Sequence, residues 1–232
     1  YTLGDLNAAA GRLGRGVGGA RLVFLLCEDT PGSLLGYFAC LRTGAVPLLL
    51  DARIAPAQLA GLLETYRPAF VLAPGDLPDE TRVLLASFTP ALEVEDSVLL
   101  RDGDRTGPEL HPELALLLTT SGSTGSPKLV RLTGKNLDAN ARSIVEYLRL
   151  DEGERPVTNL AMSYSYGMSI LNTHLLAGAA VVLTRRSVVE KPFWELVRRE
   201  RVTSLAGVPY TYQMYRRVGL MDMELPALHT LT

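Results

Sequence analysis

The 232-residue chain has only two cysteines and three histidines, and it has no excess of positive charge. Its two cysteines, Cys27 and Cys40, lie in apolar stretches without metal-ligand spacing, so we expect reduced core residues of a cytosolic protein. Lysine and arginine number 23 against 25 aspartates and glutamates, with no long run of one sign. This balance disfavours nucleic acid or an anionic membrane as the main partner.

Long apolar runs and a leader are missing as well. No uninterrupted apolar run approaches the ~18 residues that span a bilayer, and the chain starts at Tyr1 without a basic and then apolar segment. Export and membrane insertion are therefore disfavoured, and a cytoplasmic location is predicted. Because an initiator methionine is absent and no polar tail follows "LPALHTLT", we expect a chain that is cut at both ends.

Apolar segments of strand length alternate with segments of helical period. Their hydrophobicity is continuous, which is typical of a parallel sheet covered on both faces. Pro47 argues that its own strand is an edge strand or contains a bulge. The fold class is therefore predicted to be α/β, with parallel-rich sheets and flanking helices in layers. The expected strands are residues 21–26, 45–50, 69–73, 114–118, 179–183 and 202–206.

Helix signals lie between these strands. Thr30 is a suitable N-cap, Pro31 suits the first helical position, and Gly44 suits the stop. Two apolar stripes predict further helices, and a fourth helix is expected around "KPFWELVRRERV". The stripes consist of Leu59, Leu62, Leu63 and Tyr66, and of Leu137, Ala141, Ile144, Val145 and Leu148.

A polar stretch rich in breakers, residues 101–113, predicts a surface connection. We expect a single domain fragment over 1–232. Its first α/β part extends to about residue 110, and its second part, 111–232, begins with an unusual loop.

That loop is "TTSGSTGSPKLV", residues 119–130. Gly122 and Gly125 allow the backbone to approach an anion closely, hydroxyl groups can donate hydrogen bonds to it, and Lys128 supplies a full positive charge. A strand, a glycine-rich turn and then a helix would also direct backbone N–H groups at the anion, with the helix dipole in support. The pattern predicts a cradle for a polyphosphate. The hydroxyl donors are Thr119, Thr120, Ser121, Ser123, Thr124 and Ser126.

The loop is neither a Walker loop nor a dinucleotide fingerprint. Ser126 and Pro127 separate Gly125 from Lys128, and Leu129 stands where a Walker loop has its magnesium-binding hydroxyl. A plain Ser/Gly turn at a strand end is the alternative that composition alone leaves open.

The string "TTSGSTGSPKLV" followed by "RLTGKNL" resembles the phosphate loop of the adenylate-forming superfamily. This superfamily contains acyl-CoA synthetases, aryl-acid ligases, luciferases and the adenylation domains of peptide synthetases. The resemblance continues in "LGYFACLRTGAVPLLLDARIAPAQLAGLLETYRPAFVLA", in "SYSYGMSILNTHLLAGAAVVL" and in "VTSLAGVPYTYQM". Leu129 and Gly134 depart from the usual Gly and His of the family, and we interpret both as subfamily variation.

The resemblance implies an AMP-forming ligase with ATP and Mg²⁺ as cofactors. Its substrate is a carboxylic acid, which is adenylated and then passed to the thiol of CoA or of a carrier protein. Lys128 and Thr120 are the implied catalytic residues. The implied nucleotide-binding residues are Thr119, Thr120, Ser121, Gly122, Ser123, Thr124, Gly125 and Lys128.

The later motifs of the family are absent, including the Tyr-Gly-x-Thr-Glu stretch whose Glu helps to hold magnesium. The chain is therefore expected to be the N-terminal portion of such an enzyme. We expect it to bind ATP weakly and to adenylate negligibly by itself.

The resemblance also implies an acyl pocket. Tyr164 stands where many members have a gating His, followed by Tyr166 and Gly167. Relatives that activate α-amino acids usually have Asp at the position of Gly167, so an uncharged-chain acid, fatty, aryl or short hydroxy acid, is favoured. Simple core packing is the alternative for the tyrosines. Gly207, Val208 and Pro209 are expected on the other side of the pocket, with a plain turn as the alternative.

The three histidines suggest no catalytic group. His174 reads as a satisfied core residue, and His111 and His229 lie in expected loops without recognisable partners. Neither a Ser-His-Asp nor a Cys-His arrangement is readable, and no metal cluster is predicted. Two other functions stay open: a catalytically inactive acyl-binding or interaction module on the same fold, and a phosphate-binding enzyme such as a kinase, which would need an Asp-based magnesium site.

Overall fold

The structure is a computed structural model of the chain, and it describes all residues except 18–20, 104–106 and 120–127 and the side chain of Leu3. The chain consists of two compact units, Tyr1–Asn136 and Leu137–Thr232. The division lies later than the predicted connection near residue 110. The reason is that the strand after this connection pairs with the sheet of the first unit.

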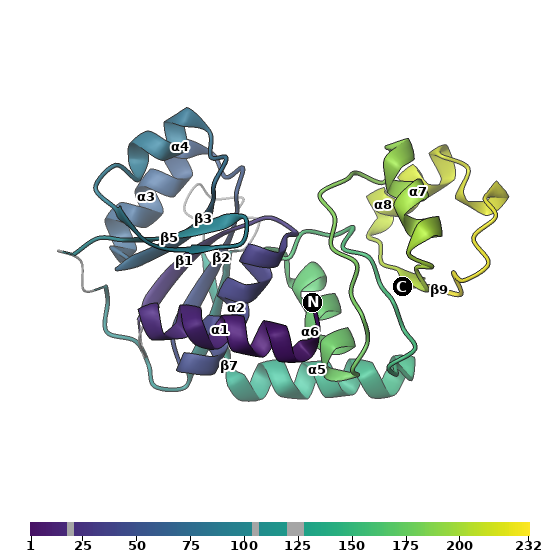
Figure 1. Cartoon of the computed structure of the whole chain (residues 1–232), viewed down its shortest axis with the longest axis horizontal. Coiled ribbons are helices and arrows are strands. Elements are labelled where there is room, and N and C mark those ends of the chain that lie inside the picture. Colours follow the sequence, from purple (N-terminus) through teal and green to yellow (C-terminus); the bar gives the residue numbers. More distant parts are fainter. Residues whose placement is uncertain (18–20, 104–106, 120–127) are drawn as a thin grey trace. The chain divides into compact units, whose positions relative to one another are not determined.

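The described part of the first unit forms a seven-stranded sheet in the order β4-β5-β3-β1-β2-β6-β7 (Figure 1). The four strands in the middle run parallel, because β1 pairs in parallel with β2 and β3, and β2 with β6. The flanking strands β4, β5 and β7 are antiparallel to their neighbours. The strands are β1 (Leu22–Cys27), β2 (Val46–Asp51), β3 (Phe70–Pro74), β4 (Thr89–Val94), β5 (Ser97–Arg101), β6 (Leu114–Thr119) and β7 (Leu129–Thr133).

Helices cover both faces of this sheet, with α1 and α2 on one side and α3 and α4 on the other in Figure 1. The start and stop signals of α2 are confirmed: Thr30 is its N-cap, Pro31 its first residue, and Gly44 ends it at φ 72°. A left-handed φ of this size favours glycine. The helices are α1 (Leu3–Val17), α2 (Pro31–Thr43), α3 (Pro56–Tyr66) and α4 (Asp79–Leu84).

The prediction of an edge strand at Pro47 is wrong, since β2 lies between β1 and β6. The Val46 N–H donates to the Arg21 carbonyl on the β1 side, so the nitrogen of Pro47 faces the other side of the strand. Pairing with β6 begins only at Leu48. The N–H that Pro47 lacks would therefore lie just before the first hydrogen-bonded pair of β2 and β6, so no hydrogen bond of this pairing is lost.

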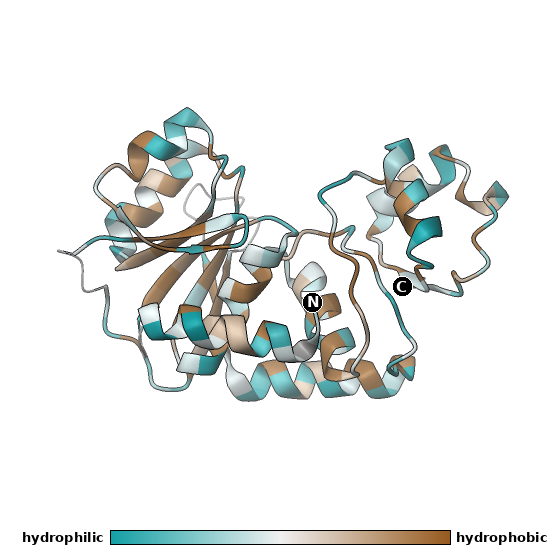
Figure 2. Cartoon of the chain, in the orientation of Figure 1, coloured by the Kyte–Doolittle hydropathy of each residue, from teal (hydrophilic) through white to brown (hydrophobic). Residues whose placement is uncertain are grey.

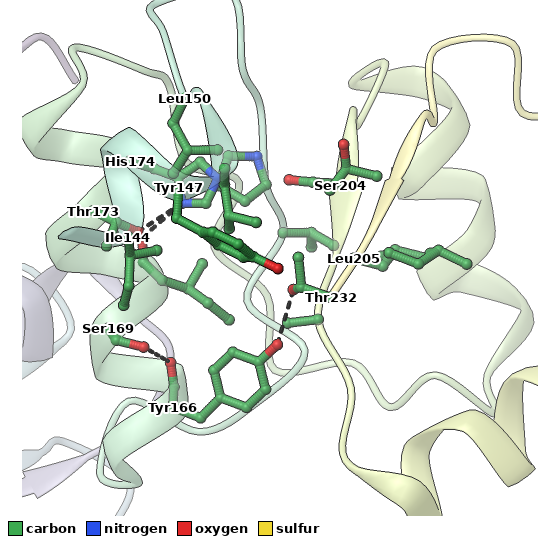
Figure 3. A pocket seen from close by; sticks show the side chains of 17 residues that line it. Ile144, Tyr147, Leu150, Tyr166, Ser169, Thr173, His174, Ser204, Leu205 and Thr232 are labelled. Carbon is green, nitrogen blue, oxygen red and sulfur yellow. Dashed lines mark hydrogen bonds between the residues drawn. The ribbon is translucent and has the colours of Figure 1, made fainter. Parts of the chain in front are cut away.

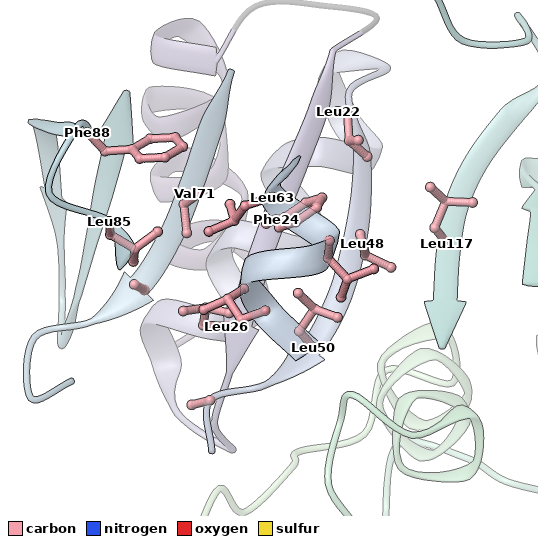
Figure 4. Packing of buried hydrophobic residues seen from close by; sticks show 14 of the residues in the cluster. Leu22, Phe24, Leu26, Leu48, Leu50, Leu63, Val71, Leu85, Phe88 and Leu117 are labelled. Atoms are coloured by element: carbon pink, nitrogen blue, oxygen red, sulfur yellow. The ribbon is translucent and has the colours of Figure 1, made fainter. Parts of the chain in front are cut away.

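The core of the first unit explains the continuous hydrophobicity of its strands. Phe24, Leu48 and Val71 are completely buried in one cluster with residues of α3 (Figure 4). The intervening residues, such as Leu25 and Leu49, are 1% and 0% exposed and belong to the opposite face. In Figure 2 these strands are mostly brown, the colour of hydrophobic residues, whereas the helices beside them carry both brown and teal residues. Each fully buried leucine or phenylalanine stabilises the unit by about 1.5–3 kcal/mol.

The sequence predicted that the glycine-rich loop leads directly into a helix, and this prediction is wrong. The loop connects β6 to β7, which pair in an antiparallel hairpin with Thr119 opposite Leu129. Helix α5 (Gly134–Leu148) starts only after β7. Its N-terminus is capped reciprocally, because the Asn136 N–H donates to Thr133 Oγ1 at 3.1 Å and the Thr133 N–H donates to Asn136 Oδ1 at 3.0 Å.

The second unit contains little sheet. Its aromatic core places the Trp194 ring edge-on to Phe193, with 5.0 Å between centroids, and to Tyr215, with 6.0 Å. The Trp194 indole N–H donates to the Val188 carbonyl at 2.7 Å. After α5, the elements are α6 (Ser165–Leu176), α7 (Lys191–Arg199), β8 (Ser204–Leu205), α8 (Pro209–Arg217), a 3-10 turn (Leu220–Asp222) and β9 (Thr230–Leu231).

The strand predicted over 179–183 is wrong, because Val182 forms only a single parallel bridge with Val157. The ladder ends at Thr184, whose N–H donates to the side-chain oxygen of Thr158 at 2.9 Å rather than to a backbone carbonyl. The strand predicted over 202–206 is reduced to Ser204–Leu205, paired in parallel with Thr230–Leu231.

Candidate functional site

The predicted phosphate loop leaves the sheet at the carboxyl edge of its parallel strands. β6 runs parallel to β2, so Thr119 lies at the same edge as the ends of β1 and β2. Ligands of open parallel sheets bind at this edge. The hairpin brings half-buried Thr119 opposite Leu129, and exposed Lys128 directly precedes Leu129. The remaining predicted loop residues lie outside the described residues: Thr120, Ser121, Gly122, Ser123, Thr124, Gly125 and Ser126.

A pocket of about 390 Å³ lies within the second unit (Figure 3). Its walls come from α5, α6, β8 and β9, and most of the lining side chains are aliphatic or aromatic. Of the predicted pocket residues, Tyr166 lines it, and the Tyr166 hydroxyl donates to Thr232 Oγ1 at 2.8 Å. A concave, mainly apolar cavity with a few polar groups is the usual form of a small-molecule site.

His174 on α6 also lines this pocket, and it is only half satisfied. Its Nδ1 lies 2.9 Å from the Ile170 carbonyl oxygen and 3.2 Å from Thr173 Oγ1. Its Nε2 is buried without a partner among the described residues. Burial lowers the pKa of the ring below 6.5, against smaller opposing effects of the Ile170 carbonyl and Glu154. The expectation of a satisfied core histidine therefore holds for one ring nitrogen only.

Ser204 on β8 is another lining residue with a buried polar atom that has no partner among the residues described. The residue is 6% exposed, and its Oγ has no hydrogen-bond partner in the described part of the chain. A buried polar group without a partner costs about 1–3 kcal/mol. Sequence analysis missed both atoms, because only the fold brings α6 and β8 to the walls of one cavity.

Gly167 is fixed by close packing of the helix start. A Cβ at this position would lie 2.2 Å from the Ala161 carbonyl oxygen and 2.4 Å from that of Leu160. The backbone thus excludes any larger residue, an aspartate included, whatever the substrate. Tyr164 immediately precedes α6, is 54% exposed and does not line the pocket.

The turn of Gly207, Val208 and Pro209 connects β8 to α8 and does not line the pocket, whereas Ala206 beside it does. The Gly207 N–H donates to the Thr232 carbonyl at 2.8 Å, which extends the pairing of β8 with β9. Pro209 is the first residue of α8, where its missing N–H costs nothing.

The other two histidines have local partners. His111 Nδ1 accepts a hydrogen bond from the Glu113 N–H at 3.2 Å. His229 Nε2 lies 3.9 Å from a carboxylate oxygen of Glu154, and its Nδ1 lies 3.0 Å from Thr230 Oγ1. The expectation that these rings lack partners is therefore corrected.

Cys27 and Cys40 are free and buried, as predicted. Burial raises the pKa of both thiols, that of Cys40 to about 12, so neither is a reactive thiolate at neutral pH. Within the described ranges, no group of three or more His, Cys, Asp or Glu side chains could hold a metal ion. None of the helices described is both long and apolar enough to cross a membrane.

Known proteins resemble this chain along most of its length. It is 34% identical over 193 residues to Novobiocin biosynthesis protein H of Streptomyces niveus, covering 77% of this chain and 32% of that protein. It is 27% identical to 3-hydroxybenzoate–CoA ligase of Aromatoleum sp. (strain CIB), covering 96% and 46%, and 28% identical to the dimodular nonribosomal peptide synthase of Bacillus subtilis (strain 168), covering 81% and 8%. The matched part of the chain therefore corresponds to less than half the length of each of these relatives.

Solved structures share the fold. MbtA of Mycobacterium smegmatis superposes with a TM-score of 0.78 at 21% identity, over 100% of this chain and 46% of that protein. The O-succinylbenzoate–CoA synthetase MenE of Bacillus subtilis, in complex with ATP and magnesium ion, gives 0.72 at 21% identity, over 100% and 62%. The model of the family "AMP-binding enzyme" matches residues 4–231, and with the hairpin and the sheet it confirms the resemblance seen in the sequence. The chain belongs to the AMP-binding enzyme family, the adenylate-forming enzymes.

Proposed function

We propose that the full-length protein with this chain is an ATP-dependent ligase that activates a carboxylic acid as its acyl-adenylate. The activated acyl group then passes to a thiol of CoA or of a carrier protein. Membership of the family over residues 4–231 is the observation that carries this proposal. The names of its relatives include a CoA ligase and a peptide synthase, so both kinds of thiol acceptor have a precedent.

The proposed reaction makes the carboxylate electrophilic. A carboxylate oxygen of the acid bonds to the α-phosphorus of ATP, the bond from this phosphorus to the bridging oxygen breaks, and pyrophosphate leaves with the electron pair. Negative charge increases on the leaving group. The Lys128 ammonium and the Thr119 hydroxyl lie at the two ends of the loop between β6 and β7, where they can stabilise this charge.

Magnesium accompanies ATP in such reactions and neutralises phosphate charge when bound. The described residues offer no cluster of carboxylates for it, so no step is assigned to the ion here. This also gives no support to a kinase with an Asp-based magnesium site.

The lining of the pocket supports an acid with an uncharged body. No Asp, Glu, Lys or Arg is among its 17 lining residues. The ammonium group of an α-amino acid placed there would have no carboxylate partner in this lining, and an unpaired buried charge is expensive. This argument does not depend on Gly167, where packing alone dictates the residue.

The test is ATP–pyrophosphate exchange by the full-length protein with a panel of carboxylic acids. Replacing Lys128→Ala should lower kcat/KM about 10²- to 10³-fold, because such charge-stabilising donors contribute about 3–4 kcal/mol. Lys191→Ala on α7 removes the same charge outside the loop and the pocket, and should leave exchange unchanged. Exchange by Lys128→Ala at the parent rate would overturn the role of the loop. Acid binding without any exchange would favour an inactive acyl-binding module.

A further inference from the structure

Three short segments of the chain form one side of the pocket. They are residues 156–157, 204–206 and 230–232, and all of them line the cavity (Figure 3). The first segment is bridged in parallel to the second, and the second pairs in parallel with the third. Because β8 and β9 have two residues each, their own pairing supplies little stability. A contact that joins the three segments would therefore determine the shape of this side of the pocket.

Thr203 lies where these segments meet. Its N–H donates to the Arg155 carbonyl at 3.0 Å, and its carbonyl oxygen accepts from the N–H groups of His229 and Thr230 at 3.0 and 3.2 Å. Its side-chain oxygen accepts from the Arg155 N–H at 2.7 Å and donates to Glu154 Oε2 at 2.6 Å. Both backbone groups and the hydroxyl of Thr203 thus join the three segments.

Glu154 is the charged group of this junction. Its side chain is 13% exposed, although glutamate is seldom buried unless it is paired. At 2.6 Å, the hydrogen bond from the Thr203 hydroxyl has the length of a charge-assisted bond to a carboxylate. The other carboxylate oxygen, Oε1, lies 3.9 Å from His229 Nε2. One carboxylate therefore reaches the two residues that directly precede β8 and β9.

The junction supports the pocket without belonging to its lining. Glu154, Thr203 and His229 are not among the residues that line the cavity, but each lies within two positions of one that does. A change at these residues alters the pocket only by moving the segments that follow them. Their effect on a bound molecule is therefore one of positioning, not of contact.

We propose that Glu154 is a positioning residue for the acid. Through Thr203 and His229 it holds β8 and β9 in register, and so fixes the side of the pocket against which the body of the acid packs. The inference rests on the proposed function, because it takes this pocket as the site of the acid.

Hydrogen exchange on the full-length protein tests the junction independently of any reaction. Glu154→Ala should lower the protection of the His229 and Thr230 amides roughly tenfold, because the Thr203 carbonyl that accepts from them loses its support. Thr203→Val keeps the volume of threonine and removes its hydroxyl, and it is the milder second variant with the same expected result. Unchanged protection in both variants would overturn the inference.

Conservative variants should rescue this protection. Glu154→Gln keeps an oxygen that accepts from the Thr203 hydroxyl, and Thr203→Ser keeps the hydroxyl itself, so both should retain most of the protection. Glu195→Ala is the matched control, since it removes a glutamate of α7 that pairs with Lys191 at 3.7 Å and lies outside the pocket lining. It should leave the protection of both amides unchanged.

Steady-state ATP–pyrophosphate exchange by the full-length protein, with an acid that the parent activates, tests the consequence for the acid. Glu154→Ala and Thr203→Val should raise KM for the acid roughly tenfold and change KM for ATP less than about twofold, since ATP is proposed to bind at the loop of the first unit. A loss of folded protein would lower the rate and leave both KM values unchanged. Glu154→Gln, Thr203→Ser and Glu195→Ala should keep the KM of the parent for the acid.

The outcomes separate the two proposals. Lower protection without a rise of KM for the acid, or an equal rise of KM for acid and ATP, overturns the positioning role and leaves the ligase standing. Exchange by the parent with no acid in the panel overturns the proposed function, and the role of Glu154 toward the acid with it, whereas the hydrogen-exchange result still decides whether Glu154 holds the two strands.

Discussion

The two units of the chain bury their apolar side chains in different ways. The first unit buries uninterrupted leucine-rich strands between helices on both faces, and its strands β1 and β2 pair in parallel along their whole length. The second unit has only two strands of two residues each among its described residues, and an aromatic cluster around Trp194 forms its core. Two of the three buried side-chain atoms found without partners belong to this second unit, and both belong to pocket-lining residues.

Under the proposed function, the two units would serve different substrates. A densely paired sheet leaves few polar groups for a ligand, and it serves as a rigid base for the loop between β6 and β7. The loosely paired second unit retains a cavity and unpaired atoms. Under the proposed function, the loop between β6 and β7 would serve ATP, and the pocket of the second unit would be the place for the acid.

The largest expected effect tests whether the units fold independently. Phe24 and Phe193 are each 0% exposed, one in the core of each unit, so replacing either by Ala should cost about 3–5 kcal/mol. In hydrogen exchange on the full-length protein, Phe24→Ala should lower protection of β1 to β3 and spare α7 and α8, and Phe193→Ala should do the reverse. Loss of protection in both units by either variant would contradict the division.

A second, smaller effect concerns Gly167. Replacing Gly167→Asp should lower the free energy of unfolding by about 3 kcal/mol, because its Cβ would overlap the carbonyl oxygens of Leu160 and Ala161. It should not create amino-acid-dependent exchange. Gly61→Ala on α3 is the control: its Cβ meets no atom within 4 Å, so about 0.5–1 kcal/mol of stabilisation is expected. A stable Gly167→Asp protein that activates an amino acid would restore position 167 as a selector of the acid.

The smallest effect is a pH dependence contributed by the pocket. Because burial lowers the pKa of His174 from 6.5 in the folded state, the unfolded chain binds more protons as the pH falls through 6.5. The free energy of unfolding should therefore decrease below pH 6.5, until the folded ring is also protonated. Denaturation of His174→Gln between pH 7 and 5 should show a shallower decrease, whereas Ser204→Ala, which removes no titratable group, should keep the slope of the parent. Equal slopes in all three proteins would refute this origin.

Sequence reasoning succeeded where a single residue run determines its own environment. The runs at 22–27 and 114–119 are buried strands because each is hydrophobic on both faces. Sequence reasoning failed where the structure of a segment depends on partners that lie far away along the chain. Pro47 is tolerated inside the sheet because pairing with β6 begins only at the next residue, Leu48. The second strand of the hairpin, "LVRLT", has only five residues, too few to be recognised as a strand ahead of the predicted helix. That His174 and Ser204 line one pocket has no sequence signal, since the residues lie 30 positions apart on different elements.

The hairpin has one more consequence, for inactivation by heat. β6 has a paired neighbour on each side, whereas β7, like β4 at the opposite edge of the described sheet, pairs with one strand only. Warming should therefore separate β7 from β6 before the central strands part, and so displace Lys128 from its place beside Leu129. ATP–pyrophosphate exchange by the full-length protein should thus disappear several degrees before the circular dichroism signal does, and the lag would measure how firmly a single ladder of hydrogen bonds holds Lys128, the residue proposed to stabilise the leaving group.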